Sequence, residues 1–382
     1  MIDVIVVGAG CVGSHMARLL AEKDLDVLVL EKDRAIGDSV NCSGIIGVEA
    51  FSKLNLPVGS IQNHLQKIKV FGPSGESIVY DPKEPWAHIV NRASFDCEMA
   101  EKAGKNGATY RMESWVEDIE VDDDGVSLTT QCEDGLRTFR AKTCVLATGY
   151  GAKFIRKVGL VNIHNCIQGV QVEAVVQDVE DVEIYLGNKI APGSFAWVVP
   201  IGNERCKIGL LAKERGGELL RELLKGPYLA PRMQDWDGTV KGSLIPMGTL
   251  SKTFAERVLV VGEAAGQVKI TTAGGIYYGL LCAEIAAEVL GRSFQENNFS
   301  AETLAAYDTE WRKILEPELN AGMVLRKIYS KMSDGQVDAL IKLAKYDGIV
   351  PLVNKVFHFD WHAPLISALL KNQLKSWVKT PV

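Results

Sequence analysis

The chain has 382 residues, of which 47% are hydrophobic and 24% charged, and this ordinary globular composition excludes a disordered, collagenous or disulfide-stapled protein. Its net charge is −6 at pH 7, from 42 Lys and Arg against 48 Asp and Glu, which argues against sequence-independent nucleic-acid binding. No apolar run approaches the roughly 18 residues of a transmembrane helix and no signal-peptide pattern opens the chain, so we expect an intracellular protein.

The chain begins with the pattern of a strand, a glycine-rich turn, a helix and a second strand. Residues 3–7 form a continuous apolar run rich in β-branched side chains, which is typical of a strand buried on both faces of a parallel sheet. Residues 14–23 have apolar side chains at helical spacing, and residues 26–30 form a second apolar run that ends at Glu31. These patterns predict a βαβ unit.

The turn in this unit carries a dinucleotide-binding fingerprint, formed by Gly8, Gly10 and Gly13. In such a motif the first glycine makes the turn, the second lets the backbone approach a pyrophosphate, and the third allows close helix packing. Phosphate charge then lies at the helix N-terminus, where amide donors favour it. Glu31, 18 positions after Gly13, is predicted to accept the hydroxyls of an adenosine ribose. A βαβ unit without a ligand is the alternative.

The middle of the chain predicts further strands and one helix. Short strands are expected at residues 67–72 and 77–80, and an amphipathic helix opens at residues 91–96. Turn sequences at residues 122–125 and 133–135 predict hairpins.

Two more apolar runs, residues 143–147 and 257–261, predict buried strands that each end in a glycine-containing turn. Because the three strand-to-glycine junctions lie far apart in sequence, we expect one extended ligand to cross the carboxyl edge of one sheet. Residues 166–251 alternate between apolar and polar, which predicts an inserted, mainly antiparallel domain.

With these junctions, the chain resembles the geranylgeranyl reductase family of flavoproteins, which have the p-hydroxybenzoate hydroxylase type of FAD fold. The matching segments are residues 8–13 with Glu31, 41–44, 92–96, 147–149, 192–200 and 261–266. The pattern is most similar to the archaeal-type digeranylgeranylglycerophospholipid reductases. The resemblance implies that reduced FAD gives a hydride, with a proton, to isolated double bonds of an isoprenoid chain on a lipid or diphosphate.

The fold implied by the resemblance is an α/β, Rossmann-type FAD-binding domain that is discontinuous in sequence, with an inserted, mostly antiparallel β-sheet substrate domain and a helical C-terminal region. The FAD-binding domain is expected from residues 1–58, 84–165 and 252–298, the substrate domain from residues 59–83 and 166–251, and the C-terminal region from residues 299–382.

The resemblance also implies which residues contact FAD. They are Gly8, Gly10, Cys11, Val12, Gly13, Glu31, Lys32, Cys42, Ser43, Gly44, Arg92, Thr148, Gly149, Gly262, Glu263, Gly274, Gly275 and Ile276. Gly274 and Gly275 open a helix predicted at residues 277–290, and the family aims this N-terminus at the pyrimidine edge of the flavin, where reduction places negative charge. A helix start without that role is the alternative. Thr148 replaces a family aspartate, so both NAD(P)H and a ferredoxin stay open as electron donors.

An apolar cavity for the isoprenoid chain is implied at a strand of the inserted domain. Its expected residues are Phe195, Trp197, Val199, Pro200 and Gly209. A hydrocarbon gains affinity mainly from buried area, at about 25 cal/mol per Å², so a long apolar channel suits this substrate. Because alternation along the strand also predicts an ordinary core, that alternative stays open.

Cys42 is the predicted catalytic residue. Reduction of an isolated alkene needs a hydride and a proton, so an acid must lie beside the flavin. Cys42 aligns with a cysteine that the family has near the flavin, and a small buried cysteine is the alternative.

Two other flavoenzyme functions stay open. The same fold serves aromatic monooxygenases and halogenases, and it also serves electron-transfer flavoprotein dehydrogenases. The latter usually carry a cluster-binding cysteine set, whereas the eight cysteines of this chain have no CxxC spacing.

The C-terminal region contains two further patterns. His358 and His362 have the i,i+4 spacing of a helical metal pair, but no third ligand is evident and we predict no metal site. Residues 364–378 combine an apolar stripe with lysines, which predicts a helix that packs on its own domain or rests on an anionic membrane surface. We therefore expect a cytoplasmic protein, peripheral at the membrane in the second case, whose partners are an isoprenoid lipid and an electron donor.

Overall fold

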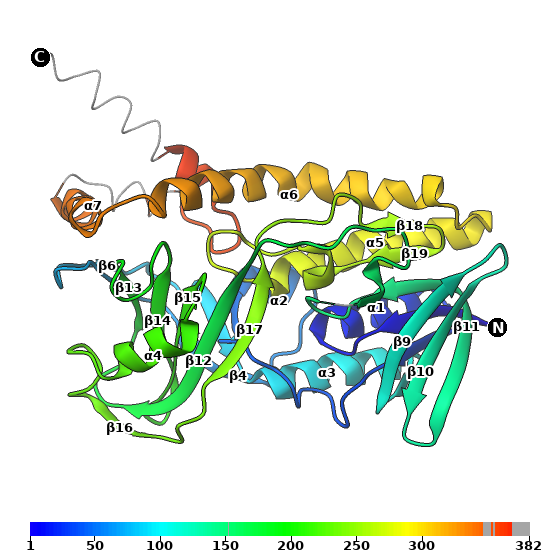
Figure 1. The fold of residues 1–382 in the computed structure, drawn as a ribbon, viewed down its shortest axis with the longest axis horizontal. Helices are drawn as coiled ribbons and strands as arrows, with labels where there is room; N and C mark the ends of the chain where they lie inside the picture. The colour runs from blue at the N-terminus through cyan, green and yellow to red at the C-terminus, as the bar shows by residue number, and fades with distance from the viewer. Residues whose placement is uncertain (152, 347–352, 354–355, 369–382) are drawn as a thin grey trace, which may run out of the picture.

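The computed structural model describes residues 1–382 except residues 152, 347–352, 354–355 and 369–382 (Figure 1). Within this part of the chain the strands form two eight-stranded sheets and one three-stranded sheet. The long helices α5 (Ile276–Glu296) and α6 (Ala301–Tyr329) run side by side along one edge of the molecule. No helix of the described residues is both long enough and apolar enough to span a bilayer.

The first sheet contains the strands expected for the dinucleotide-binding domain. In spatial order they are β18 (Phe254–Ala255), β19 (Val258–Val260), β11 (Gly135–Leu146), β1 (Ile2–Val7), β2 (Val27–Leu30) and β8 (Thr109–Arg111). β1 pairs in parallel with β11 and β2, and β11 pairs in parallel with β19. The three strand-to-glycine junctions are therefore neighbours at one carboxyl edge, as the sequence predicted. β9 (Ser114–Val121) and β10 (Val126–Cys132) extend β11 as an antiparallel meander.

Burial on both faces explains why β1 is a continuous apolar run. Val4 and Val6 belong to a core that also includes residues of α5, α6, α1 (Cys11–Ala21) and α3 (Arg92–Lys105). Ile5 and Val7 belong to a second core on the opposite face, with residues of the meander and of the segment around η1 (Lys153–Ile155). A parallel strand covered on both sides has no solvent face, so alternation is lost.

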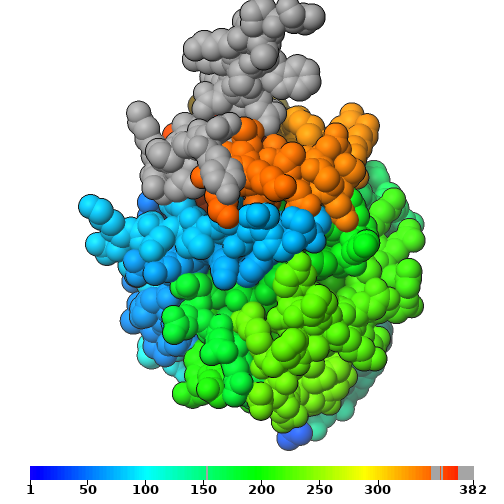
Figure 2. Space-filling model, turned by 90° about the vertical axis from the view of Figure 1, so that its left-hand side faces the viewer, coloured from blue at the N-terminus to red at the C-terminus, as the bar shows by residue number. Residues whose placement is uncertain are grey.

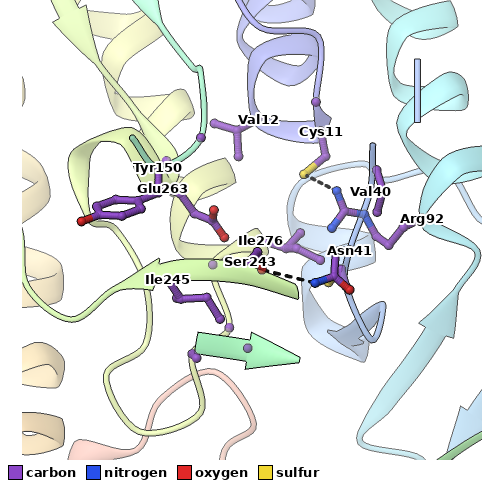
Figure 3. Close-up of a pocket in the computed structure, with 18 of the residues that line it drawn as sticks. Cys11, Val12, Val40, Asn41, Arg92, Tyr150, Ser243, Ile245, Glu263 and Ile276 are labelled. Carbon is purple, nitrogen blue, oxygen red and sulfur yellow. Dashed lines mark hydrogen bonds between the residues drawn. The ribbon is translucent and has the colours of Figure 1, made fainter. Parts of the chain in front are cut away.

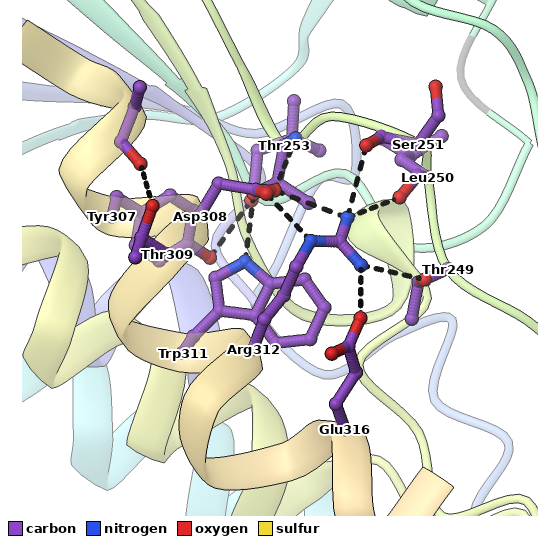
Figure 4. Close-up of polar contacts among 12 residues, drawn as sticks. Thr249, Leu250, Ser251, Thr253, Tyr307, Asp308, Thr309, Trp311, Arg312 and Glu316 are labelled. Atoms are coloured by element: carbon purple, nitrogen blue, oxygen red, sulfur yellow. Dashed lines mark hydrogen bonds and ion pairs between the residues drawn. The ribbon is translucent and has the colours of Figure 1, made fainter. Parts of the chain in front are cut away.

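A polar cluster fixes α6 to the loop before β18 (Figure 4). The Asp308 carboxylate accepts hydrogen bonds from the Thr253 amide at 3.0 Å and the Thr253 hydroxyl at 2.8 Å. The Trp311 indole donates to the same hydroxyl at 2.9 Å. Arg312 pairs with Asp308 at 2.6 Å and donates to the Leu250 carbonyl at 2.7 Å. These mutual contacts hold α6 against the first sheet.

The second sheet is the inserted, mostly antiparallel unit. In spatial order its strands are β16 (Met233–Trp236), β12 (Cys166–Val176), β15 (Arg205–Ala212), β14 (Phe195–Gly202), β13 (Val182–Leu186), β5 (Ile68–Phe71) and β6 (Ser77–Tyr80), with β17 (Lys241–Pro246) also paired to β12. Only the β13–β5 pair is parallel among the pairings of this sheet in the described residues. α4 (Gly216–Leu224) covers β12 and β15. α7 (Asp334–Tyr346), orange in Figure 2, lies on the blue β5–β6 hairpin.

A small sheet connects the two larger ones. It has the order β3 (Ile45–Gly47), β7 (Ala87–Val90) and β4 (Ile61–Leu65), and β3 leads into the short helix α2 (Val48–Lys53). Strand β4 comes from the range that the sequence assigned to the substrate domain, whereas its partner β7 comes from a range assigned to the FAD-binding domain. The predicted α/β fold with an antiparallel insertion and a helical C-terminal region is confirmed.

Candidate functional site

A cavity of about 1230 Å³ lies between the carboxyl edge of the first sheet and one face of the second (Figure 3). Its volume exceeds the roughly 300–1,000 Å³ of ordinary small-molecule pockets. A cavity of this size suits an extended ligand together with a second molecule.

Most residues that were expected to contact a cofactor meet in the wall of this cavity. Those that line it are Gly8, Gly10, Cys11, Val12, Glu31, Lys32, Cys42, Ser43, Arg92, Thr148, Gly149, Gly262, Glu263, Gly274, Gly275 and Ile276. Gly13 and Gly44 do not line the cavity; they lie behind its wall.

The three glycines of the first turn have different surroundings. Gly8 has a φ of +104°, and a Cβ there would lie 2.5 Å from the Ala147 carbonyl oxygen. A Cβ on Gly13 would overlap the Gly8 carbonyl oxygen. A Cβ on Gly10 would meet no atom within 4 Å. Gly8 and Gly13 are therefore needed for packing, whereas Gly10 leaves open space beside the cavity.

The N-terminus of α1 lies at this turn, and its first amide, that of Cys11, donates a hydrogen bond to the Asp96 carboxylate of α3. The residue before the helix, Gly10, provides no side-chain cap, and the first turn contains no acidic side chain. The first amides of a helix lack internal partners, so they and the helix dipole favour an anion.

Glu31 lies at the end of β2, where it already has backbone partners. Its Oε2 accepts a hydrogen bond from the Ala9 amide at 2.6 Å, and its Oε1 accepts one from the Asp33 amide at 3.0 Å. A carboxylate has about four acceptor positions, so Glu31 keeps capacity for ligand hydroxyls while the two amides fix its orientation.

Glu263 is the acidic side chain of the third junction, in the short turn η2 (Gly262–Ala265). Its carboxylate points into the space between Val12 and Ile276 (Figure 3). Among the described residues it has no hydrogen-bond or ion-pair partner. Desolvation raises the pKa of Glu263, and Arg92 opposes this increase. This carboxyl group is therefore available to a ligand.

Arg92 is the first residue of α3 and places a fixed cation in the wall. Its Nη2 donates to both Asp96 carboxylate oxygens at 2.9 Å and to the Cys11 Sγ at 3.5 Å. Burial raises the pKa of Cys11 to about 12, so this sulfur stays a neutral thiol.

The loop that contains Cys42 is held by a lysine from the second sheet. The Lys207 ammonium donates to the Cys42 carbonyl at 3.0 Å and to the Ser43 carbonyl at 3.4 Å. Burial lowers the pKa of Lys207. The Gly44 amide donates to the Cys42 Sγ at 3.4 Å, and a Cβ on Gly44 would overlap the Val90 carbonyl oxygen. Gly44 thus shapes the loop from behind the wall.

Two buried polar atoms of cavity-lining residues have no partner within the described structure. They are the Asn41 Oδ1 and the Trp197 Nε1. The Asn41 amide nitrogen, in contrast, donates to the Ser243 hydroxyl at 3.4 Å (Figure 3). Buried polar atoms usually have partners. An acceptor and a donor that lack them suit a ligand that carries both kinds of group.

The second sheet supplies an apolar part of the wall. Its alternating residues that line the cavity are Val182, Ile184 and Leu186 of β13 and Phe195, Trp197 and Val199 of β14. Two residues that were expected in this wall, Pro200 and Gly209, do not line it. A Cβ on Gly209 would overlap the Trp197 ring, so this glycine makes room for the indole.

Sequence reasoning missed one segment of the wall, residues 357–362, which we call the strap. Phe357, Phe359, Asp360 and His362 of the strap line the cavity. The Lys269 ammonium pairs with Asp360 at 2.5 Å and donates to the Phe359 carbonyl at 3.1 Å. Burial lowers the pKa of Lys269, and Asp360 opposes this decrease. The pair fastens the strap to the glycine-rich loop before α5.

His362 is also used to hold the strap. Its Nδ1 lies 2.6 Å from the Thr271 hydroxyl, its Nε2 lies 2.9 Å from the Phe359 carbonyl, and its amide donates to Glu318 at 2.7 Å. Burial lowers the pKa of His362 to about 4. Residues 358–362 are not helical, so the i,i+4 spacing of His358 and His362 does not place them on one helix face.

The amphipathic stretch predicted at residues 364–378 lies outside the described residues from position 369 onward. The sequence contained no signal for the strap apart from the two histidines, for which we predicted no metal site. No sequence pattern indicated a role for Lys207 or Lys269, because the partner of each lysine is distant in the sequence and comes close only in the folded chain.

Known proteins resemble the chain over most of its length. The sequence profile of the lycopene cyclase protein family matches residues 3–319. The chain is 30% identical to a digeranylgeranylglycerophospholipid reductase of Methanocaldococcus jannaschii, over 88% of this chain and 89% of that protein. It is also 30% identical to digeranylgeranylglycerophospholipid reductase 2 of Methanothermobacter thermautotrophicus, over 89% of this chain and 91% of that protein.

Solved structures share the fold at lower identity. A geranylgeranyl bacteriochlorophyll reductase-like protein from Thermoplasma acidophilum matches with a TM-score of 0.86 and 22% identity, over 97% of this chain and 98% of that one. The p-nitrophenol 4-monooxygenase of Pseudomonas putida matches with a TM-score of 0.71 and 18% identity, over 93% of this chain and 96% of that one. At these identities the likeness concerns the fold alone.

Proposed function

The chain belongs to the geranylgeranyl reductase family of FAD-dependent oxidoreductases, and we propose that it saturates isolated double bonds in the isoprenoid chain of a lipid. The sequence relatives named as lipid reductases support this substrate class. The monooxygenase structure shares only the fold, so it does not favour the alternative that the sequence left open.

The observation that carries the proposal is the division of one cavity into two kinds of wall. Glycine-rich backbone, Glu31 and Glu263 form one wall, and apolar side chains of the second sheet form another. A ligand with a pyrophosphate and many hydroxyls suits the first wall, and a hydrocarbon suits the second.

The residues of the first wall suit FAD. We assign the pyrophosphate to the amides at the α1 N-terminus, the adenosine ribose to Glu31, and a hydroxyl of the ribityl chain to Glu263. When bound and reduced, FAD supplies the hydride for this chemistry.

Cys42 is the proposed proton donor. The alkene gains a hydride at one carbon and the Cys42 proton at the adjacent carbon, so an S–H bond breaks while a C–H bond forms. Negative charge is then left on sulfur. The Lys207 ammonium, which donates to the Cys42 carbonyl at 3.0 Å, compensates that charge until a proton from solvent restores the thiol.

The electron donor stays a prediction, with NAD(P)H and a ferredoxin as candidates. Each would be tested by anaerobic reduction of the holoenzyme, followed as bleaching of the flavin absorbance.

The function is tested by anaerobic turnover of a geranylgeranyl lipid with chemically reduced holoenzyme, followed by mass spectrometry. We expect products that carry two additional hydrogens for each reduced bond. A monooxygenase or halogenase would form no product without oxygen, and that result would overturn the proposal.

Trp197→Ala tests the apolar wall. Loss of this large side chain should lower turnover by about 10-fold or more, because the hydrocarbon loses buried contact area. Flavin content should stay unchanged. Trp236→Ala is the matched control, because Trp236 is partly buried against the core of the second sheet and does not line the cavity. Equal loss of flavin and turnover in Trp197→Ala would contradict a substrate-binding role.

A further inference from the structure

The C-terminal half of α6 concentrates exposed apolar side chains. Thirteen large hydrophobic residues are exposed in the described part of the chain, and four of them lie within residues 323–328. They are Met323, Val324, Leu325 and Ile328, with exposed fractions of 45%, 48%, 39% and 46%. We call these four residues the α6 apolar face. Val324 and Ile328 lie one helical turn apart, and exposed apolar side chains that gather on a folded protein are typical of an interaction site.

The helix segment that carries this face is basic, although the whole chain has a net charge of −6. Residues 320–333 contain Arg326, Lys327 and Lys331 and no acidic residue. Lys327 and Lys331 are exposed, and within the described structure neither forms an ion pair. Their charge is therefore available to an anionic partner.

The α6 apolar face is continuous with the cavity. Leu325 is 39% exposed and also lines the cavity, so the cavity reaches the molecular surface beside this helix. Phe357 of the strap also lines the cavity, where its ring contacts those of Tyr80 and Trp86. The helix lies along one edge of the molecule, with its C-terminal half toward the second sheet (Figure 1).

We propose that the α6 apolar face docks on an anionic lipid bilayer, with Leu325 at the point where an isoprenoid chain passes from the bilayer into the cavity. The inference rests on the proposed function, because a lipid substrate has its hydrocarbon in the bilayer. Apolar side chains that enter the interface and lysines that approach anionic headgroups both favour this contact.

A second copy of the chain fits the same face less well. A two-fold interface would bring Lys327 and Lys331 of one copy near those of the other, and like charges oppose such pairing. An anionic surface would instead attract these lysines.

The test is co-sedimentation of the full-length holoenzyme with vesicles of phosphatidylcholine, with and without phosphatidylglycerol. We expect binding that is stronger with phosphatidylglycerol and weaker at high salt. Val324→Asp combined with Ile328→Asp should weaken binding by about 10-fold or more, because two charges replace apolar contacts. Lys327→Glu combined with Lys331→Glu should remove the preference for phosphatidylglycerol.

The matched control is Leu136→Asp combined with Val161→Asp. These residues are 62% and 64% exposed, and neither lies on α6. This variant should bind vesicles like the unmodified protein. If Val324→Asp with Ile328→Asp leaves vesicle binding unchanged, the docking proposal is wrong. If that variant instead converts a dimer to a monomer in light scattering while vesicle binding persists, the face is a contact between copies and the proposal is also wrong.

Turnover separates docking from the proposed function. All variants should reduce a detergent-dispersed geranylgeranyl lipid at the unmodified rate, whereas the α6 variants should lose turnover of the same lipid embedded in vesicles. No turnover of the dispersed substrate by the unmodified protein would overturn the function while leaving the vesicle-binding result valid.

Discussion

The two walls of the cavity differ in which part of the chain forms them, the backbone in one wall and side chains in the other. The wall at the first sheet is largely backbone, shaped by Gly8, Gly10 and Gly262, where a Cβ would be crowded or would enter open space. The wall at the second sheet and the strap consists of side chains such as Trp197 and Phe359. The first wall is therefore fixed by short sequence motifs, whereas the second depends on which distant segments pack together.

Gly10→Leu tests the backbone wall and should abolish most flavin binding. Because a side chain at Gly10 meets open space, the protein should fold, but the leucine should block the pyrophosphate position. We expect FAD affinity to fall about 100-fold or more, which corresponds to about 3 kcal/mol. Flavin absorbance after reconstitution and circular dichroism measure the two outcomes.

The contrast within the same turn is Gly13→Leu, which should prevent folding because its Cβ overlaps the Gly8 carbonyl. Gly104→Leu, at another position with no atom near a Cβ, is the control that should keep both fold and flavin. Full flavin binding by Gly10→Leu would show that no pyrophosphate lies at this turn.

Asp360→Asn tests the side-chain wall. It leaves the buried Lys269 ammonium without its partner, and loss of one member of a buried pair costs about 3–5 kcal/mol. Denaturant unfolding should show this loss. Replacement of both members, by Lys269→Met with Asp360→Leu, should recover most of the stability.

An exposed ion pair provides the control for this experiment. Arg292 and Glu310 are 51% and 45% exposed, and Glu310→Gln should cost less than about 1 kcal/mol. If Asp360→Asn is no more destabilising than Glu310→Gln, the strap is not held by its buried pair.

Protonation of His362 has the smallest expected effect, which is a pH dependence of the stability of the folded chain. Burial lowers the pKa of His362 to about 4 in the folded chain, whereas the ordinary value is about 6.5. Between these two pH values the unfolded chain binds a proton at His362 and the folded chain does not. The contribution to stability is therefore complete above about pH 6.5 and decreases down to about pH 4, by at most about 3 kcal/mol. The measurement is the thermal midpoint across this range.

His362→Gln should remove this part of the pH dependence, whereas His358→Gln, at an exposed histidine of the same segment, should keep it. His15, whose pKa burial also lowers, contributes in the same direction in all three proteins. An identical pH dependence in His362→Gln and the unmodified protein would contradict a buried neutral imidazole.

Local sequence patterns were enough to predict the βαβ unit, the three parallel junctions and the residues that meet at them. Apolar runs and glycine turns report local backbone geometry, so they can be interpreted without knowledge of distant partners. Packing requires three other glycines, because a Cβ on Gly13, Gly44 or Gly209 would overlap a neighbouring atom. These glycines lie behind the wall and do not line the cavity.

Local patterns did not predict the strap, the Lys269–Asp360 pair or the Lys207 contact with the Cys42 loop. These features arise only in the tertiary structure. The partners are separated by 91 residues in the first pair and 165 in the second, and no local pattern connects them. A side chain becomes part of a wall when folding brings remote segments within contact distance, and that depends on the packing of the whole chain and not on the residues beside it.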